Sequence, residues 1–196
     1  THILNGDALL EQLPASIAGK RIIMRECLMD GKVSAKDWPT FYQVRWQYLD
    51  GLTGGLSFED YQAKSIYEIK KIQHLSPSEK IFLWFEEDLF CQVNLWFCLH
   101  VIAFETDAKD VHLVMPDNRS PYSFASYTSA ELEALLPQAK PAGDLMPWSQ
   151  LWQAYRDKNW KQLGDIAIDL QSDWPFLVPA VKAQQDRLEN NNYQGR

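Results

Sequence analysis

Three short segments of this 196-residue chain place charged residues directly after an apolar stretch. Carboxylates in such positions can act as general acids or bases, or can hold Mg²⁺ through bound waters. An arginine can bind a phosphate or a carboxylate through two parallel hydrogen bonds. These residue types together predict a site for a small anionic ligand. The three segments are Asn5-Gly6-Asp7, Arg25-Glu26 and Glu86-Glu87-Asp88.

The charged residues can be assigned candidate roles. Arg25 and Arg45 would hold the anionic group of the ligand. The mixture of charges suits a nucleotide or a phosphorylated metabolite, with hydrolysis or group transfer as the reaction. We find no GxSxG motif and no cysteine with an evident histidine partner. The candidate acid–base residues, which are also the candidate Mg²⁺ ligands, are Asp7, Glu26 and Asp88. The candidate ligand-binding residues are Asn5, Gly6, Arg25, Arg45, Glu87 and Gln92.

Each charged segment also has a purely structural interpretation. Asp88 would cap the helix that follows it, and Glu86 and Glu87 would favour the positive end of that helix dipole. Asp7 would be the N-cap of a short helix over residues 8–13. Adjacent Arg25 and Glu26 would form a surface pair worth less than about 1 kcal/mol. Taken one at a time, the segments therefore leave both interpretations open.

The spacing of apolar residues predicts the elements that would position these side chains. Apolar runs predict strands at 2–5, 21–25, 81–85 and 111–115, and helical spacing predicts helices between them. This alternation is typical of an α/β fold with a mostly parallel sheet of about four to five strands flanked by helices. The carboxyl ends of parallel strands lie along one edge, so the three charged segments would gather there. Their convergence favours a ligand site at that edge.

The segment over residues 89–104 is apolar around nearly its whole circumference, which predicts a buried helix. It is shorter than the roughly 20 residues that a membrane span needs, and Gln92, Asn94 and His100 interrupt it. We therefore expect a central crossover helix and no membrane association. Other expected helices cover 37–49, 57–74 and a short stretch from Thr128, with a glycine-rich loop at 51–55 and a loop at 117–127.

The C-terminal third predicts a separate helical region. We expect an α/β domain over 1–140, a linker at 141–143 within a helical subdomain over 141–190, and a frayed tail at 191–196. The tail helices should cover 147–155, 160–170 and 175–188, with tryptophans packing between them. An alternative function follows from this region, because a tryptophan-rich surface or the 117–127 loop could serve a non-enzymatic interaction or regulatory module.

Composition restricts the remaining classes of function. The formal net charge of −7 disfavours a nucleic-acid surface as the main role. The three cysteines, Cys27, Cys91 and Cys98, lack CxxC spacing and predict neither a disulfide framework nor a zinc site. The chain enters a strand without a basic and apolar leader, so we expect a cytoplasmic protein. The oligomeric state is left open.

Several of these segments resemble the signature of a bacterial family of unknown function, number eighteen thirty-five. The likeness covers most of the chain, and the strand–acid–helix segment is its most specific part. Related sequences often have proline after the glycine that matches Gly31, where this chain has Lys32, and an arginine like Arg45 recurs among them. The resemblance implies the fold and the choice of positions, and it implies no activity. Its segments are His2–Asp7, Arg25–Leu28, Leu83–Gln92, Trp152–Tyr155 and Trp174–Leu177.

Overall fold

The protein is built on one five-stranded sheet with helices on both faces. A computed structural model describes residues 1–117 and 123–189, and the 118–122 part of the predicted loop and the predicted tail from 191 lie outside them. The strand order is β2-β1-β3-β4-β5. The strands are β1 (His2–Asn5), β2 (Arg21–Met24), β3 (Ile81–Trp84), β4 (Val111–Val114) and β5 (Lys140–Pro141).

The first four strands run parallel to one another, as the sequence predicts. Asn5 pairs with Met24, and Leu4 pairs with Trp84, so the ends of β1, β2 and β3 are level. The short strand β5 is antiparallel to β4 and was not predicted, because Pro141 was expected to lie in a linker. A two-residue edge strand with a proline has almost no periodicity from which it could be recognised.

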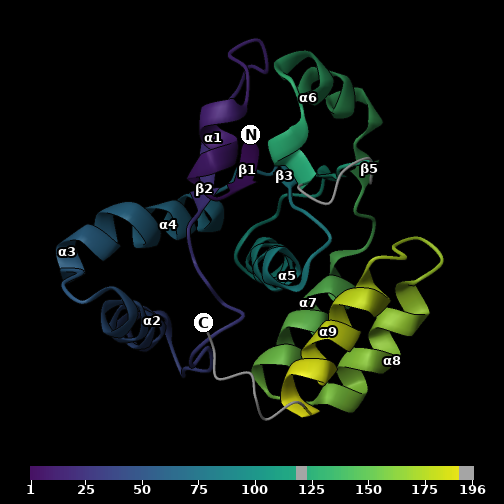
Figure 1. Ribbon diagram of the computed structural model, residues 1–196. Coiled ribbons are helices and arrows are strands. Elements are labelled where there is room, and N and C mark those ends of the chain that lie inside the picture. Colours follow the sequence, from purple (N-terminus) through teal and green to yellow (C-terminus); the bar gives the residue numbers. More distant parts are fainter. Residues whose placement is uncertain (118–122, 190–196) are drawn as a thin grey trace.

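The helices form two layers around the sheet (Figure 1). Helices α1 and α6 lie on one face of the sheet and α5 lies on the other. The helices are α1 (Asp7–Gln12), α2 (Trp38–Thr53), α3 (Phe58–Tyr61), α4 (Tyr67–Gln73), α5 (Leu89–Glu105), α6 (Ser129–Leu135), α7 (Leu145–Arg156), α8 (Trp160–Leu170) and α9 (Leu177–Glu189). A π-helix, η1 (Gln62–Ile66), joins α3 to α4, and η2 (Ser123–Ser126) and η3 (Leu136–Gln138) are 3₁₀ helices.

One predicted helix end and one predicted continuous helix are corrected by the structure. Helix α2 continues through Gly51 to Thr53 and ends at Gly54, whose φ of 67° closes the helix in the left-handed region. The helix predicted over 57–74 has Ser57 as its N-cap, whose side chain accepts from the Asp60 amide. A π-helical turn then interrupts it, which sequence periodicity does not reveal.

Helix α5 occupies the centre of the molecule, as predicted. Its side chains Val93, Leu95, Trp96 and Leu99 have no exposed surface, and α7 packs along it. The described residues contain no helix with the length and hydropathy needed to cross a membrane. The centre of the fold is thus a buried helix that begins after a short turn at the carboxyl end of β3.

The connections after β1 and β3 leave the sheet on opposite faces. The chain passes from β1 into α1 on one face, and from β3 into α5 on the other face. In open sheets of this type, ligands bind outside the carboxyl ends of strands where the connections diverge. The carboxyl ends of β1, β2 and β3 are therefore the place to search for a site.

Candidate functional site

A pocket of about 380 Å³ opens at the carboxyl ends of β1 and β2. We call it the β1–β2 pocket. The end of α2 and the π-helix η1 form its opposite wall, and the first turn of α5 contributes Phe90. Five of the nine predicted site residues line it. The lining residues are Asn5, Gly6, Asp7, Met24, Arg25, Glu26, Cys27, Leu49, Thr53, Leu56, Tyr61, Lys64, Ser65 and Phe90.

Asp7 and Arg25 form an ion pair at this pocket. Arg25 donates from Nε at 2.9 Å and from Nη2 at 2.7 Å to the Asp7 carboxylate, and from Nη1 at 2.7 Å to the Lys64 carbonyl. These hydrogen bonds hold the pKa of Asp7 below its usual value and raise that of Arg25. One hydrogen on each Nη atom has no protein acceptor among the described residues, so the guanidinium can still bind an anion.

The structure corrects the predicted capping role of Asp7. Gly6 is the N-cap of α1, and no side-chain hydrogen bond caps this helix. Gly6 has a φ of 93°, which suits glycine, and its amide donates to the Met24 carbonyl at 2.9 Å. The tight turn after β1 directs the Asp7 side chain toward Arg25, where it forms a salt bridge.

Glu26 and Arg45 form a second ion pair that is entirely buried. Arg45 Nε donates to Glu26 Oε2 at 2.9 Å, and neither side chain has exposed surface. The Tyr61 hydroxyl donates to the other Glu26 oxygen, and burial beside this carboxylate raises the pKa of Tyr61. Arg45 also donates to the carbonyls of Cys27 and Asp30. Because its donors hold the loop after β2, Arg45 positions the pocket wall. Contrary to the prediction, it is not available to bind a ligand.

A buried amide network connects the strand ends to α5. Asn94 donates from Nδ2 to Asn5 Oδ1 at 2.9 Å and to the Glu26 carbonyl at 2.7 Å. Its Oδ1 accepts from the Leu28 amide at 3.3 Å. Asn5 in turn donates to Cys91 Sγ at 2.9 Å. Because every amide group here has a partner, the network fixes the strand ends and the start of α5 relative to one another.

Asp88 lies outside the β1–β2 pocket, in a second group of side chains. It is the N-cap of α5, and its Oδ1 accepts from the Cys91 amide at 3.1 Å. Potential ligand atoms of Glu86, Asp88 and Cys91 all lie within 4.8 Å of one another. Burial, and then the charge of Asp88, raise the pKa of the Cys91 thiol. Within the described residues, Asp7 and Glu26 do not join Asp88 in such a group, which differs from the predicted Mg²⁺ set.

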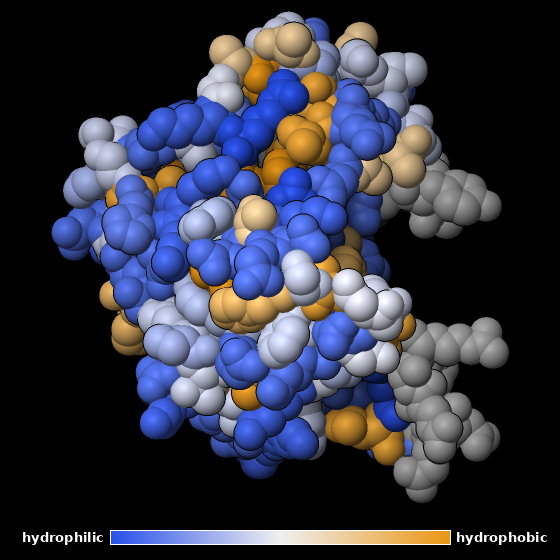
Figure 2. Space-filling model, turned by 90° about the vertical axis from the view of Figure 1, so that its left-hand side faces the viewer, coloured by the Kyte–Doolittle hydropathy of each residue, from blue (hydrophilic) through white to orange (hydrophobic). Residues whose placement is uncertain are grey.

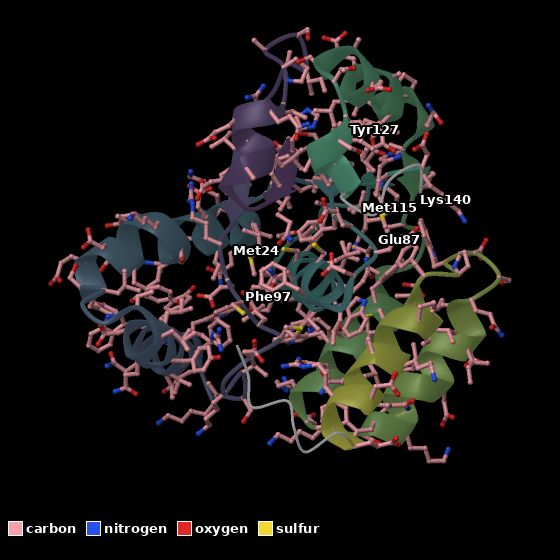
Figure 3. The ribbon with its side chains drawn as sticks, viewed as in Figure 1. Met24, Glu87, Phe97, Met115, Tyr127 and Lys140 are labelled. Atoms are coloured by element: carbon pink, nitrogen blue, oxygen red, sulfur yellow. The ribbon has the colours of Figure 1, made fainter. Side chains whose placement is uncertain are left out.

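The two remaining predicted residues lie near this second group. Gln92 is fully buried and donates from Nε2 to the Glu86 carbonyl at 2.7 Å. Figure 3 shows Glu87 apart from Met24, which lines the β1–β2 pocket. The predicted residues other than Arg45 thus form one set that lines the β1–β2 pocket and another set in the turn after β3 and the first turn of α5, and the hydrogen bond from Asn5 to Cys91 connects the two.

Sequence reasoning missed Lys64, Tyr61, Asn94 and Phe90, which contribute to or support the pocket. Lys64 lies in the π-helix, a conformation that often occurs at functional sites. Among the described residues, its ammonium group has no hydrogen-bond or ion-pair partner. Nothing in the local sequence distinguishes it from the other lysines of an amphipathic helix.

A second cavity, of about 800 Å³, lies elsewhere on the molecule. It is lined in part by Lys32, Tyr155 and Lys158, and it includes no predicted site residue.

Comparisons of the chain with protein-family models, curated proteins and solved structures found no match. The resemblance to the bacterial family of unknown function stays a prediction. The interpretation of the site therefore depends on its geometry and chemistry.

Proposed function

We propose that the protein binds a small organic anion, a nucleotide or a phosphorylated metabolite, in the β1–β2 pocket. The observation that carries this proposal is the presence of two cations, Arg25 and Lys64, at a pocket whose accessible surface is largely apolar. The two carboxylates in its lining, Asp7 and Glu26, are each paired with an arginine. Arg25 would supply its two remaining hydrogens to the anionic group, and Lys64 would supply its ammonium. Hydrolysis or group transfer at this site stays a prediction.

The apolar lining favours a ligand that carries a ring. Met24, Leu49, Leu56 and Phe90 line the pocket together with the charged residues. Small-molecule sites are typically apolar clefts of about 300–1,000 Å³ with a few polar groups that orient the ligand. A volume of about 380 Å³ lies at the lower end of this range. A nucleoside monophosphate, with its ring on the apolar wall and its phosphate at Arg25, suits both the size and the chemistry.

The alternative, an interaction module, has less support. Three of the tail tryptophans, Trp148, Trp152 and Trp174, are at most 5% exposed, and Trp160 is half-buried. Among the described residues, the exposed large apolar side chains are scattered over six helices, and single exposed apolar residues are normal on protein surfaces. Figure 2 shows the face that carries α2 to α4, where hydrophobic residues form separate patches among hydrophilic ones. This face presents no single broad apolar surface.

Thermal melting with a ligand panel tests the proposal. The panel would contain nucleoside mono-, di- and triphosphates, sugar phosphates and inorganic phosphate. A ligand at 100 times its Kd stabilises the folded state by about 2.7 kcal/mol. At about 2–4 °C per kcal/mol for a chain of this size, the melting temperature would rise by about 5–10 °C.

Matched lysine variants locate the binding. Lys64→Ala removes a cation at the pocket, whereas Lys70→Ala removes an exposed one from the neighbouring helix α4. We expect Lys64→Ala to weaken binding by about 10–100-fold, the value of a hydrogen bond to a charged group, and Lys70→Ala to leave it unchanged. Absence of a shift with every compound, or equal effects of both variants, would contradict the proposal.

A further inference from the structure

We propose that Glu86, Asp88 and Cys91 bind a divalent transition cation of the Zn²⁺ class at the start of α5. This inference goes beyond the anion pocket, because it concerns other side chains and needs no organic ligand. Glu86 and Asp88 lie in the turn after β3, and Cys91 lies in the first turn of α5. Figure 1 shows this turn where the chain leaves the sheet and enters the central helix.

The distances suit a metal centre. One oxygen of Glu86, one oxygen of Asp88 and Cys91 Sγ lie within 4.8 Å of one another. Bonds of about 2.0–2.3 Å in a tetrahedral zinc site place ligand atoms roughly 3.3–3.8 Å apart. The second oxygen of the exposed Asp88 carboxylate is not used by the helix cap, since the Cys91 amide donates to Oδ1 alone.

A second observation concerns Gln92, a residue outside the three ligands that lies at the same turn. The side chain of Gln92 is fully buried, and its Oε1 has no hydrogen-bond partner in the described structure. Gln92 follows Asp88 by one helical turn, and its Nε2 donates to the Glu86 carbonyl. The amide is thus held against the turn that carries both carboxylates. A buried oxygen without a partner costs roughly 1–3 kcal/mol, and a metal-bound water or the metal itself would remove that cost.

The donor set selects the kind of cation. Mg²⁺ and Ca²⁺ take oxygen ligands, whereas a thiolate favours Zn²⁺ and related transition cations. Cys91 Sγ donates its proton to Glu86 Oε2 at 3.4 Å, and metal binding would release that proton to solvent. Asn5 Nδ2 donates to Cys91 Sγ at 2.9 Å and would stabilise the resulting thiolate, as an outer hydrogen bond does in metal sites. Three protein ligands leave a coordination position open for water or for another group.

Titration with Co²⁺ alone tests the proposal, because cobalt substitutes for zinc and bound thiolates give a near-ultraviolet charge-transfer band. The protein would first be treated with a chelator, and the Co²⁺ titration would be followed by Zn²⁺. We expect the band to appear in proportion to added Co²⁺ and to disappear when Zn²⁺ displaces it. Absence of the band in the wild-type protein would overturn the proposal.

Two variants and one control assign the ligands. Cys91→Ser should abolish the band, whereas Cys98→Ser, seven residues further along the same buried helix, should retain it. Asp88→Asn should keep the helix cap, since asparagine caps helices as well as aspartate does. The Asp88→Asn change should nevertheless weaken Co²⁺ binding by more than about tenfold. Changes to residues that only hydrogen-bond to a metal ligand already cost about 10–100-fold in affinity, and Asp88 is proposed to be a ligand itself. An unchanged band in Cys91→Ser, or unchanged affinity in Asp88→Asn, would refute the assignment.

Discussion

Replacement of Arg45 by methionine should strongly destabilise the protein. The change removes the hydrogen bonds of Arg45 to Glu26, Cys27 and Asp30. Among the described residues, it leaves the buried Glu26 carboxylate with only the Tyr61 hydroxyl as a side-chain partner. Breaking a fully buried pair by removing one partner costs about 3–5 kcal/mol. At about 2–4 °C per kcal/mol, the melting temperature should fall by roughly 6–20 °C.

Glu26→Gln should be milder, because the amide oxygen can still accept a hydrogen bond. We expect a loss of about 1 kcal/mol, the difference between a hydrogen bond to a charged partner and one to a neutral partner. The double variant should lose less unfolding free energy than the sum of the losses in the two single variants. In the Glu26→Gln background, Arg45→Met no longer leaves a buried carboxylate without its partner. A coupling energy of about 1–3 kcal/mol is expected for residues in direct contact.

Urea unfolding of the four proteins, followed by circular dichroism, measures these free energies. Equal slopes of free energy against urea would show that the variants unfold from comparably compact states. A loss of less than about 1 kcal/mol for Arg45→Met, or additivity within about 0.5 kcal/mol, would refute the buried pair.

Three further predictions concern single positions. Gly31→Ala should cost about 1–3 kcal/mol in urea unfolding, because Gly31 has a φ of 77° and an added Cβ would lie 2.5 Å from the Tyr48 ring; an unchanged midpoint would contradict this. Asp88→Asn should leave the metal-free melting temperature nearly unchanged while Asp88→Ala lowers stability by about 1 kcal/mol, and equal losses would exclude the capping role. Burial, with Arg156 as a smaller cause, lowers the pKa of His100 to about 4 from 6.5. Between pH 4 and 6.5 the unfolded state therefore binds more protons at this histidine than the folded state does, so the free energy of unfolding should fall as the pH drops from 6.5 toward 4. His100→Gln should flatten this part of a plot of unfolding free energy against pH.

The sequence was sufficient for the main features of the fold because the relevant patterns are local. The four parallel strands have mostly apolar runs, and α5 is apolar around nearly its whole circumference, so their type followed from composition and length. The π-helix at Gln62–Ile66 and the edge strand at Lys140–Pro141 did not, because each depends on tertiary contacts and covers five residues or fewer. The division of the chain into an α/β domain over 1–140 and a helical subdomain over 141–190 stays a prediction.

The candidate site was predicted only in part, for a reason of geometry. Strand ends could be placed on one edge from the order of elements, and this brought Asp7 and Arg25 together. Which side chains turn inward could not be inferred, since the burial of Arg45 depends on the path of the loop after β2. The contribution of Lys64 likewise depends on a helix that reaches the pocket from about 40 residues further along the chain.

The most direct measurement of the central claim is an amide chemical-shift map of the ¹⁵N-labelled protein with the nucleotide or sugar phosphate that gives the largest thermal shift. The β1–β2 pocket predicts the largest changes at Gly6, Arg25, Lys64 and Ser65, including the Arg25 side-chain Nε–H. Changes concentrated instead around Lys32 and Lys158, which line the larger cavity, would contradict the account.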